Sequence, residues 1–299
     1  TQILEPQLLG LLCARDVAGN NAIGKFILIG DHKQLPAVVL QSESQSEVCE
    51  ECLQSIGLYN LKDSLFERLY RTVSADHSSP TTQRFYDMLC RQGRMNVEVA
   101  QFPNRAFYGG LLEAVGLPHQ QGKLVLAPGL ESDEFADILV HRVAFLPSVP
   151  ETPSQSAKIN HFEARLTARL AASVYRQYEA SNSGFNSALT LGVITPYRSQ
   201  IALIKREIAA LGIPVLNDIL VDTVERFQGS ERDVIIYSFC VNRTYQLKFL
   251  ANLTEEKGVW IDRKLNVALT RARKQLFMTG VPRLLRQNPI YADLLDTVL

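Results

Sequence analysis

Short apolar runs alternate along this chain with longer segments of helical periodicity. Strands buried on both faces read as continuous apolar runs, and amphipathic helices repeat every three to four residues. The alternation therefore predicts an α/β fold, in which helices flank a parallel sheet. The expected strands cover residues 25–30, 142–146, 189–195, 219–224, 233–239 and 275–280, and the expected helices cover residues 160–180, 196–211, 263–273 and 283–298.

Two of the expected helices carry start signals. Asn160, followed three residues later by Glu163, has the spacing of a capping box. Thr195 followed by Pro196 has the pattern of an N-cap with proline at the first helical position. A polar, aperiodic stretch over residues 41–84 surrounds the more apolar "LKDSLFERLY", which predicts a helix between loops.

Composition narrows the class of protein. A chain of 299 residues with 46% hydrophobic and 21% charged residues is typical of about two globular domains. No apolar run approaches the roughly 20 residues of a membrane span, so we expect no membrane partner and a cytoplasmic location, or a nuclear one in a eukaryote. The 31 basic and 31 acidic residues cancel, so any nucleic-acid site must be a local feature.

The five cysteines are scattered and odd in number, which favours reduced thiols over a disulfide framework. Cys49 and Cys52 form one Cys-x-x-Cys pair. A structural zinc site needs a second pair, and none is evident, so a solvated helix or loop is favoured and no metal ligand is predicted.

Gly19, Gly24 and Lys25 have the glycine and lysine spacing of a P-loop. A P-loop follows a strand, opens a helix and continues with Ser or Thr, because its amides and hydroxyl bind phosphate and Mg²⁺. Here the glycines precede an expected strand, and Phe26 occupies the hydroxyl position. We therefore predict a loop that enters a strand, and no P-loop.

The stretch "GDHKQLPAV" follows that expected strand and places Asp31 and Gln34 at its carboxyl end, where parallel sheets bind ligands. Together with four later stretches, it resembles the C-terminal half of superfamily 1 helicases, as typified by the nonsense-mediated-decay RNA helicase and the replication helicase/nuclease. The four are "CRQGRMNVEVAQFPNRAFYGGLL" (90–112), "GVITPYRSQ" (192–200), "VDTVERFQGSERDVIIYS" (221–238) and "KLNVALTRAR" (264–273). The five occur in the family's order and span nearly the whole chain.

The resemblance implies a RecA-like P-loop NTPase fold. Residues 1–115 would be the C-terminal part of a first RecA-like domain with a linker, and residues 116–299 a complete second one. The family's Walker A and Walker B motifs, which carry the Mg²⁺ ligands, are expected upstream of Thr1. The chain would then be a fragment that is inactive alone, and the missing N-terminal part of the same protein would be its partner.

For ATP, the resemblance implies that Gln34 senses the γ-phosphate and that Arg94 and Arg271 reach it from across the cleft. Arginine suits this role because its fork binds two phosphate oxygens and keeps its charge. Glu231 would bond the ribose after a tight turn at Gly229. The remaining nucleotide-binding candidates are Asp31, Gln92 and Arg273. The plainer alternatives are a surface arginine at 271 and a solvated loop acid at 231.

For single-stranded DNA or RNA, the resemblance points to the start of the helix expected after residue 195. A helix N-terminus offers free N–H groups to a backbone phosphate. The candidates are Thr195, Tyr197, Arg198 and, in the later stretch, Thr223. Tyr197 has packing as an equal alternative. Phosphates are common to DNA and RNA, so these contacts do not distinguish the two.

The chain departs from the family pattern at several positions. Gly93 stands where the family has a tyrosine that stacks on adenine, and losing such a surface costs on the order of 1 kcal/mol. Asn96 and Val97 replace His-Pro, and Ala37 replaces a proline. The change at Gly93 puts base selectivity in doubt or passes base recognition to another residue, and the change at Ala37 is milder.

Two functions remain in competition. The first is an ATP-dependent helicase or translocase that hydrolyses ATP between two RecA-like domains. The alternative is a degenerate relative that binds nucleic acid or protein without ATPase activity, which the changes at Gly93 and Ala37 favour. The retained arginines favour the enzyme. An unrelated nucleotide-fold enzyme, such as a kinase, is disfavoured by the order of the five stretches.

Overall fold

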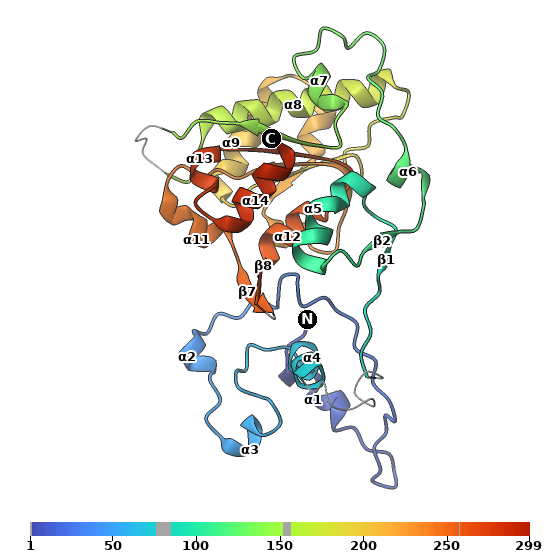
Figure 1. Ribbon diagram of the computed structural model, residues 1–299, viewed down its shortest axis with the longest axis vertical. Coiled ribbons are helices and arrows are strands. Elements are labelled where there is room, and N and C mark those ends of the chain that lie inside the picture. The colour runs from blue at the N-terminus through green and yellow to red at the C-terminus, as the bar shows by residue number, and fades with distance from the viewer. Residues whose placement is uncertain (1, 76–84, 152–156, 257) are drawn as a thin grey trace. The chain divides into compact units, whose positions relative to one another are not determined.

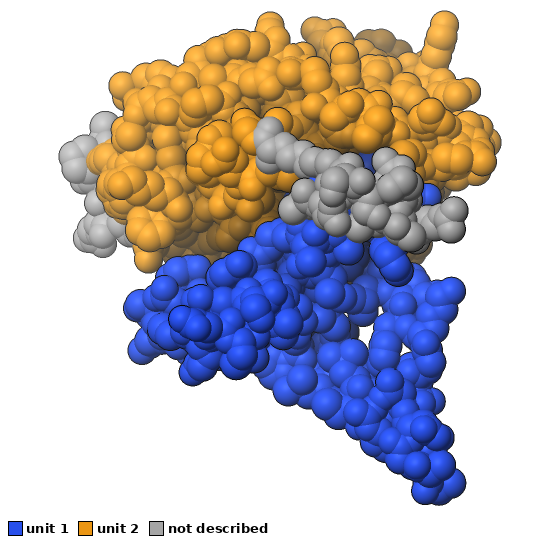
Figure 2. Space-filling view, turned by 60° about the horizontal axis from the view of Figure 1, so that its bottom comes forward, with its two compact units in different colours: residues 1–89 blue, residues 90–299 orange. Residues whose placement is uncertain are grey.

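The computed structural model describes residues 2–75, 85–151, 157–256 and 258–299. The chain forms two compact units, Thr1–Leu89 and Cys90–Leu299, which Figure 2 shows in blue and orange. The predicted domain boundary, between residues 115 and 116, falls inside the second unit, so residues 90–115 pack with the residues that follow them. That residues before this boundary belong to a first RecA-like domain stays a prediction.

The second unit is built on a five-stranded, fully parallel sheet with the order β3-β9-β6-β4-β5 (Figure 1). The predicted α/β fold is confirmed, and five of the six expected strands are present. Their bounds are β3 Val143–Pro147, β4 Leu191–Ile194, β5 Leu220–Asp222, β6 Arg232–Ser238 and β9 Ala272–Gly280.

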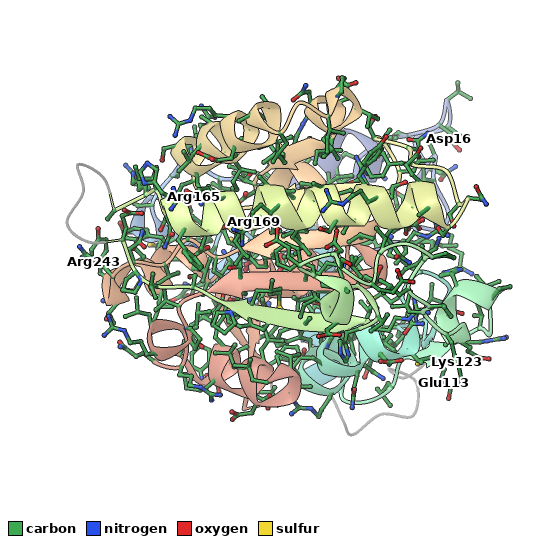
Figure 3. All side chains as sticks on the ribbon, turned by 90° about the horizontal axis from the view of Figure 1, so that it is seen from above. Asp16, Glu113, Lys123, Arg165, Arg169 and Arg243 are labelled. Atoms are coloured by element: carbon green, nitrogen blue, oxygen red, sulfur yellow. The ribbon has the colours of Figure 1, made fainter. Side chains whose placement is uncertain are left out.

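Helices cover both faces of this sheet. Helices α8 (His161–Ala180) and α9 (Arg198–Ala210) pack side by side on one face, and α5 (Val97–Tyr108), α12 (Arg263–Leu269) and α14 (Pro289–Val298) lie on the other (Figures 1 and 3). All four residues of β4 are buried, as expected of a strand covered on both sides. The main core lies between the sheet and the α8–α9 layer.

Shorter elements complete the second unit. The two-residue strands β1 (Arg91–Gln92) and β2 (Glu113–Ala114) pair in parallel, and β7 (Leu253–Glu256) and β8 (Val259–Asp262) form an antiparallel hairpin. The short helices are α6 Pro118–Gln121, α7 Ala136–Leu139, η2 Pro214–Asp218, α10 Val224–Phe227, η3 Thr244–Gln246, α11 Leu247–Leu250 and α13 Pro282–Leu285. None of the helices in the described ranges is long and apolar enough to cross a membrane.

The first unit consists of helices and irregular chain. Its helices are α1 Glu5–Leu12, α2 Glu43–Ser46, α3 Glu51–Gln54 and α4 Leu65–Ala75. Helix α4 confirms the helix expected within residues 41–84, of which 76–84 lie outside the described residues. Arg68 on α4 binds the Glu5 carboxylate of α1, and His32 stacks on Tyr70 with ring centroids 4.3 Å apart.

The strand expected over residues 25–30 is wrong. These residues are irregular, and Ile27 and Ile29 are exposed. A strand needs a hydrogen-bonded neighbour, and the described residues of the first unit contain no strand that offers one. An apolar run alone therefore does not produce a strand.

One start signal is half right and the other is wrong. Asn160 caps α8 by accepting from the Glu163 amide at 2.9 Å, but the Glu163 carboxylate does not return to Asn160, whose own amide donates to Gln200 Oε1 at 2.8 Å. Helix α9 begins at Arg198 instead of residue 196. Thr195 is not its cap, because the Thr195 amide continues the sheet with a 3.1 Å bond to the Asp222 carbonyl.

Two expected helices are shorter than the pattern predicted. The helix over 263–273 stops at Leu269, because the following residues enter β9, where Ala272 pairs with Arg232 of β6. The helix over 283–298 is divided into α13 and α14. Pro289 begins α14. Proline has no backbone N–H to continue the helical hydrogen bonds of the preceding turn, so the two helices are separate.

Candidate functional sites at the two ends of the sheet

The amino end of the sheet gathers charged residues from three parts of the sequence. Strands β6 and β9 begin side by side, so Glu231 and Arg273 lie close together. Arg94 reaches the same place from the turn after β1. Its Nε lies 2.8 Å from Glu231 Oε2, and Arg273 Nε lies 3.5 Å from Glu231 Oε1. One carboxylate thus lies between two guanidinium groups.

The turn that carries Arg94 is held by amide side chains. Gln92 Oε1 accepts from the amides of Arg94 at 3.0 Å and Met95 at 2.8 Å. The buried Gln120 donates to the Gln92 carbonyl at 2.9 Å. The Asn96 side chain caps α5, and the Asn96 backbone amide donates to the Arg273 carbonyl at 2.7 Å. The residue at the family's histidine position therefore joins the turn to β9, a role that sequence reasoning missed.

The ion pairs at this end are half exposed. The exposed fractions of the side chains are 36% for Arg94, 44% for Glu231 and 33% for Arg273. Exposed ion pairs of this kind contribute little to stability, about 0 to 1 kcal/mol. A second acid, Asp233, contacts Arg273 at 3.2 Å and Lys274 at 2.8 Å.

Arg271 lies directly behind this exposed cluster. Only 2% of its surface is exposed, and its guanidinium donates to the carbonyls of Val267 at 3.1 Å and Ser230 at 3.3 Å. Arg94 and Arg271 meet at Thr270, whose carbonyl accepts from Arg94 at 3.4 Å and whose hydroxyl accepts from Arg271 at 3.1 Å. Arg271 is therefore not the surface arginine of the plainer alternative.

A tight turn leads into this end of the sheet. Gly229 has a φ of +78°, a left-handed conformation that favours glycine, and the Ser230 carbonyl that follows faces Arg271. The predicted turn at Gly229 is confirmed, and it places Glu231 immediately before the first residue of β6.

Asp31 and Gln34 belong to the first unit and interact with each other. Gln34 Nε2 donates to Asp31 Oδ2 at 2.8 Å, and Asp31 Oδ1 accepts from the Lys33 amide at 3.0 Å. The side chains thus brace one turn. Their predicted role toward the nucleotide stays a prediction.

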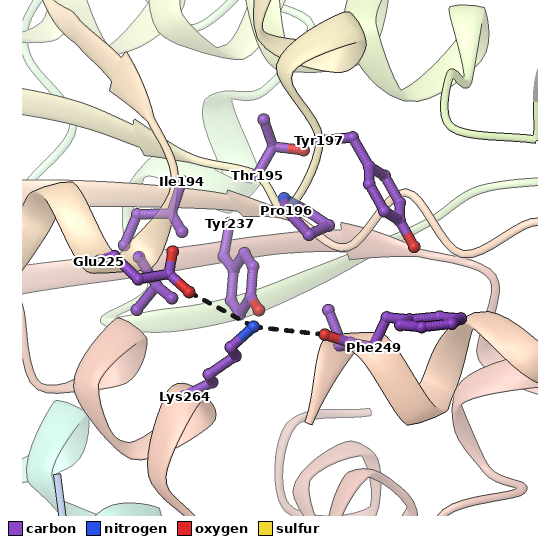
Figure 4. A pocket seen from close by; sticks show the side chains of 10 residues that line it. Ile194, Thr195, Pro196, Tyr197, Glu225, Tyr237, Phe249 and Lys264 are labelled. Atoms are coloured by element: carbon purple, nitrogen blue, oxygen red, sulfur yellow. Dashed lines mark hydrogen bonds and ion pairs between the residues drawn. The ribbon is translucent and has the colours of Figure 1, made fainter. Parts of the chain in front are cut away.

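The carboxyl end of the sheet contains a pocket of about 240 Å³ (Figure 4). Lys264 lies at one side, with its Nζ 3.3 Å from Glu225 Oε1 and 3.4 Å from the Phe249 carbonyl oxygen. Burial raises the pKa of Glu225, but hydrogen bonds from its own amide and the Thr223 hydroxyl, together with Lys264, lower it overall. The lining residues are Ile194, Thr195, Pro196, Tyr197, Val224, Glu225, Tyr237, Phe249, Leu250 and Lys264.

The four predicted nucleic-acid residues all lie at this end. Thr195 is fully buried, and its hydroxyl has no hydrogen-bond partner among the described residues. The Tyr197 hydroxyl accepts from Gln246 at 3.1 Å, and burial raises its pKa. Arg198 is exposed at the first residue of α9, and Thr223 precedes α10. Their roles toward nucleic acid stay predictions.

Sequence reasoning missed most of the pocket. Glu225 and Lys264 lie inside stretches that carry the resemblance, which was an available signal. Phe249 lies between two such stretches, and nothing in the local pattern marks it. Cys49 and Cys52 are exposed free thiols, and no group of three or more His, Cys, Asp or Glu side chains within the described ranges is arranged to hold a metal ion.

Comparison with known proteins gives consistent results. The family model of an AAA domain matches residues 61–283. An uncharacterized ATP-dependent helicase of Methanocaldococcus jannaschii is 30% identical over 277 residues, which are 91% of this chain and 34% of that protein. The DNA replication ATP-dependent helicase/nuclease of Xenopus laevis is 32% identical over 96% of this chain and 24% of its own length. Helicase sen1 of Schizosaccharomyces pombe is 27% identical over 92% of this chain and 14% of its own length. The chain thus spans about a third or less of each of these relatives.

Proposed function

Because the chain belongs to the superfamily 1 helicases of the replication helicase/nuclease and nonsense-mediated-decay type, we propose that it is the C-terminal part of an ATP-dependent helicase or translocase. The proposed substrate is single-stranded DNA or RNA. ATP is hydrolysed between this chain's second unit and the preceding part of the same protein. In this proposal the amino end of the sheet binds ATP, and the carboxyl end binds the nucleic-acid strand.

The amino end fits a triphosphate by the chemistry of its donors. The half-exposed guanidinium groups of Arg94 and Arg273 carry forks that match phosphate oxygens, with Arg271 behind them. Negative charge spreads over the γ-phosphate oxygens during phosphoryl transfer, and arginines fixed beforehand stabilise it. In this proposal Arg94 leaves Glu231 for the phosphate, and Glu231 becomes free to accept from a ribose hydroxyl.

Because Arg271 is buried, either its side chain or the residues that cover it must move before it can contact a phosphate. Its partners include the neutral oxygens of Val267, Ser230 and Thr270. Mg²⁺ would neutralise phosphate charge in this reaction, and we expect its ligands in the preceding part of the protein.

The carboxyl end of the sheet is suited to bind the sugar-phosphate backbone of a nucleic-acid strand. Helix α9 begins without a side-chain cap, so its first amides are available to a phosphate, and the exposed Arg198 adds charge beside them. Thr223 has a hydroxyl at the end of the neighbouring β-strand, and in this proposal that hydroxyl leaves Glu225 and donates to a phosphate. Such contacts suit a motor that moves along any sequence.

We propose that the isolated chain does not hydrolyse ATP. Its only P-loop-like spacing ends in Phe26 instead of a hydroxyl residue, and residues 25–30 are irregular where a P-loop would open a helix. The observation that carries the whole proposal is the cluster of Arg94, Glu231 and Arg273 in front of Arg271. A protein that only binds a partner has no use for this many arginines around one carboxylate, although Gly93 still favours that alternative.

The test is ATP hydrolysis by the longest natural form of the protein, with and without single-stranded DNA and RNA. Arg271→Ala is compared with Arg165→Ala, which removes an exposed arginine from α8 (Figure 3). The proposal predicts hydrolysis that is stimulated by a strand, lost in Arg271→Ala and kept in Arg165→Ala. Background hydrolysis of the unaltered protein under every condition would favour the binding protein instead.

A further inference from the structure

We infer that the pocket at the carboxyl end of the sheet binds a nucleobase of the single strand, with Phe249 as its stacking surface. The inference rests on the proposed function and goes beyond it. The contacts proposed above reach phosphates only and carry no information about the bases.

The size of the pocket favours a single ring system. At about 240 Å³ it lies below the roughly 300 to 1,000 Å³ typical of pockets for drug-sized ligands. Seven of its ten lining residues are apolar or aromatic and three are polar, a mixture that suits a flat organic group with a polar edge. The apolar walls come from Ile194, Pro196, Val224 and Leu250.

Phe249 offers an open aromatic surface at this pocket. It lines the pocket, yet 64% of its surface is exposed, so the ring is not used to fill the core. Its ring meets Tyr245 edge-on, with centroids 6.5 Å apart, and Figure 4 shows it on the far side of Lys264 from Glu225. Every base has a π-face, so an exposed aromatic ring is a general stacking surface for a single strand.

The polar groups of the pocket match the edge of a base. Thr195 lines the pocket but is fully buried, so its hydroxyl lies behind the surface that a base would contact. Lys264 and Glu225 place a donor and an acceptor 3.3 Å apart. Base edges carry donors and acceptors at neighbouring atoms, so one base can engage both side chains.

The surroundings of the pocket favour a nucleic-acid strand over other ligands. Arg198 adjoins the lining residue Tyr197 in sequence, and Thr223 adjoins the lining residue Val224. Arg226 on α10 and Lys248 on α11 add exposed cations next to the lining residues. A strand whose phosphates contact Arg198 and Thr223 passes the mouth of the pocket, where one of its bases can enter.

The test compares Phe249→Ala with Tyr245→Ala in the 299-residue chain. Tyr245 is a matched control because it is 56% exposed, contacts the same ring and does not line the pocket. Both variants are titrated against a labelled single-stranded DNA with natural bases and against the same sugar-phosphate strand with abasic residues. Thermal melts check that each variant is folded.

We expect Phe249→Ala to bind the natural strand about tenfold more weakly, because stacking on an aromatic ring is worth about that much per base. Its binding to the abasic strand should be unchanged, and Tyr245→Ala should bind both strands like the unaltered chain. If folded Phe249→Ala bound the natural strand normally, the pocket would not hold a base, although the proposed phosphate contacts would stand.

Two further outcomes would also overturn the inference. If the unaltered chain bound no strand at all, the proposed contacts and the base pocket would fail together. If Phe249→Ala lost binding of free adenosine but kept strand binding, the pocket would belong to a free nucleoside.

Discussion

The two ends of the same sheet are built from different chemistry. The amino end carries Arg94, Glu231 and Arg273 on the surface, and its polar contacts are ion pairs between half-exposed side chains. The carboxyl end carries hydroxyl and aromatic groups around a pocket, with one ion pair between Lys264 and Glu225. The first set suits a small, highly charged ligand, and the second suits a long polymer that is held at many weak contacts.

One short element nevertheless connects the two ends. Lys264, the second residue of α12, lines the pocket, and the helix ends at Leu269, immediately before Thr270 and Arg271 at the amino end. Helix α12 is therefore a direct covalent connection between residues of the two ends.

The largest expected effect comes from breaking the amino end. In the longest natural form, Arg94→Ala should reduce strand-stimulated ATP hydrolysis by about a thousandfold, the scale at which such arginines contribute to phosphoryl transfer. The measurement is the turnover rate at saturating ATP and strand. Arg165→Ala is the control. A turnover rate of Arg94→Ala within a few fold of normal would show that Arg94 has no part in the reaction.

A second effect comes from the buried acid at the carboxyl end. The Glu163 carboxylate accepts from the hydroxyls of Ser148 at 2.9 Å and Ser238 at 2.8 Å and from the Cys240 amide at 2.9 Å. Burial outweighs these bonds and raises its pKa from 4.5 to about 7. The folded protein therefore holds this proton more tightly than the unfolded chain does, and stability is lost as the pH rises from 4.5 to about 7.

The size of this loss is on the order of 3 kcal/mol, and Glu163→Gln should abolish it, because glutamine keeps the shape without the charge. Urea unfolding at about pH 5 and about pH 8 measures the difference for each protein. Equal pH dependence of the two proteins would show that Glu163 does not titrate in this range.

A smaller effect is expected from Thr223 at the carboxyl end. Thr223→Ala should raise the strand concentration for half-maximal ATPase stimulation about fivefold, because one phosphate hydrogen bond is lost. Thr223→Ser keeps the hydroxyl and should restore the normal value. Stimulation that is identical in all three proteins would mean that Thr223 makes no contact with the strand.

The smallest effect concerns the missing tyrosine at the amino end. A Cβ atom at Gly93 would be accommodated, since it would meet Leu117 and Val115 at ordinary distances of 3.5 and 3.6 Å. Gly93→Tyr should lower the KM for ATP about threefold by stacking on the base, and Gly93→Ala, which adds no ring, should not. If both variants changed KM alike, the change would come from the turn and not from stacking.

Much of the sheet could be predicted from the sequence, because strands such as 191–194 and 232–238 are buried on both faces and therefore read as apolar runs. The failed strand at 25–30 has an equally apolar run, but a strand depends on a partner that the run does not reveal. Similarly, the helical pattern through Arg271 was overridden by the pairing of β9 with β6.

Residues of the candidate sites could be predicted only where they lie in short sequence motifs. Arg94, Glu231 and Arg273 were found from short motifs, and the structure brings them together. The burial of Arg271, the role of Asn96 and the contribution of Phe249 depend on contacts between distant segments. Such contacts leave no local signal, so they appear only in the folded chain.

If the amino end of the sheet serves ATP hydrolysis and the carboxyl end serves strand binding, one titration should separate the two functions. ATP hydrolysis by the longest natural form is measured against strand concentration for Arg94→Ala and Thr223→Ala. We expect Arg94→Ala to lower the maximal rate and leave the half-saturating concentration of the nucleic-acid strand unchanged, and Thr223→Ala to raise that concentration and leave the maximal rate unchanged. If either substitution changed both quantities to the same extent, the division of work between the two ends would be contradicted.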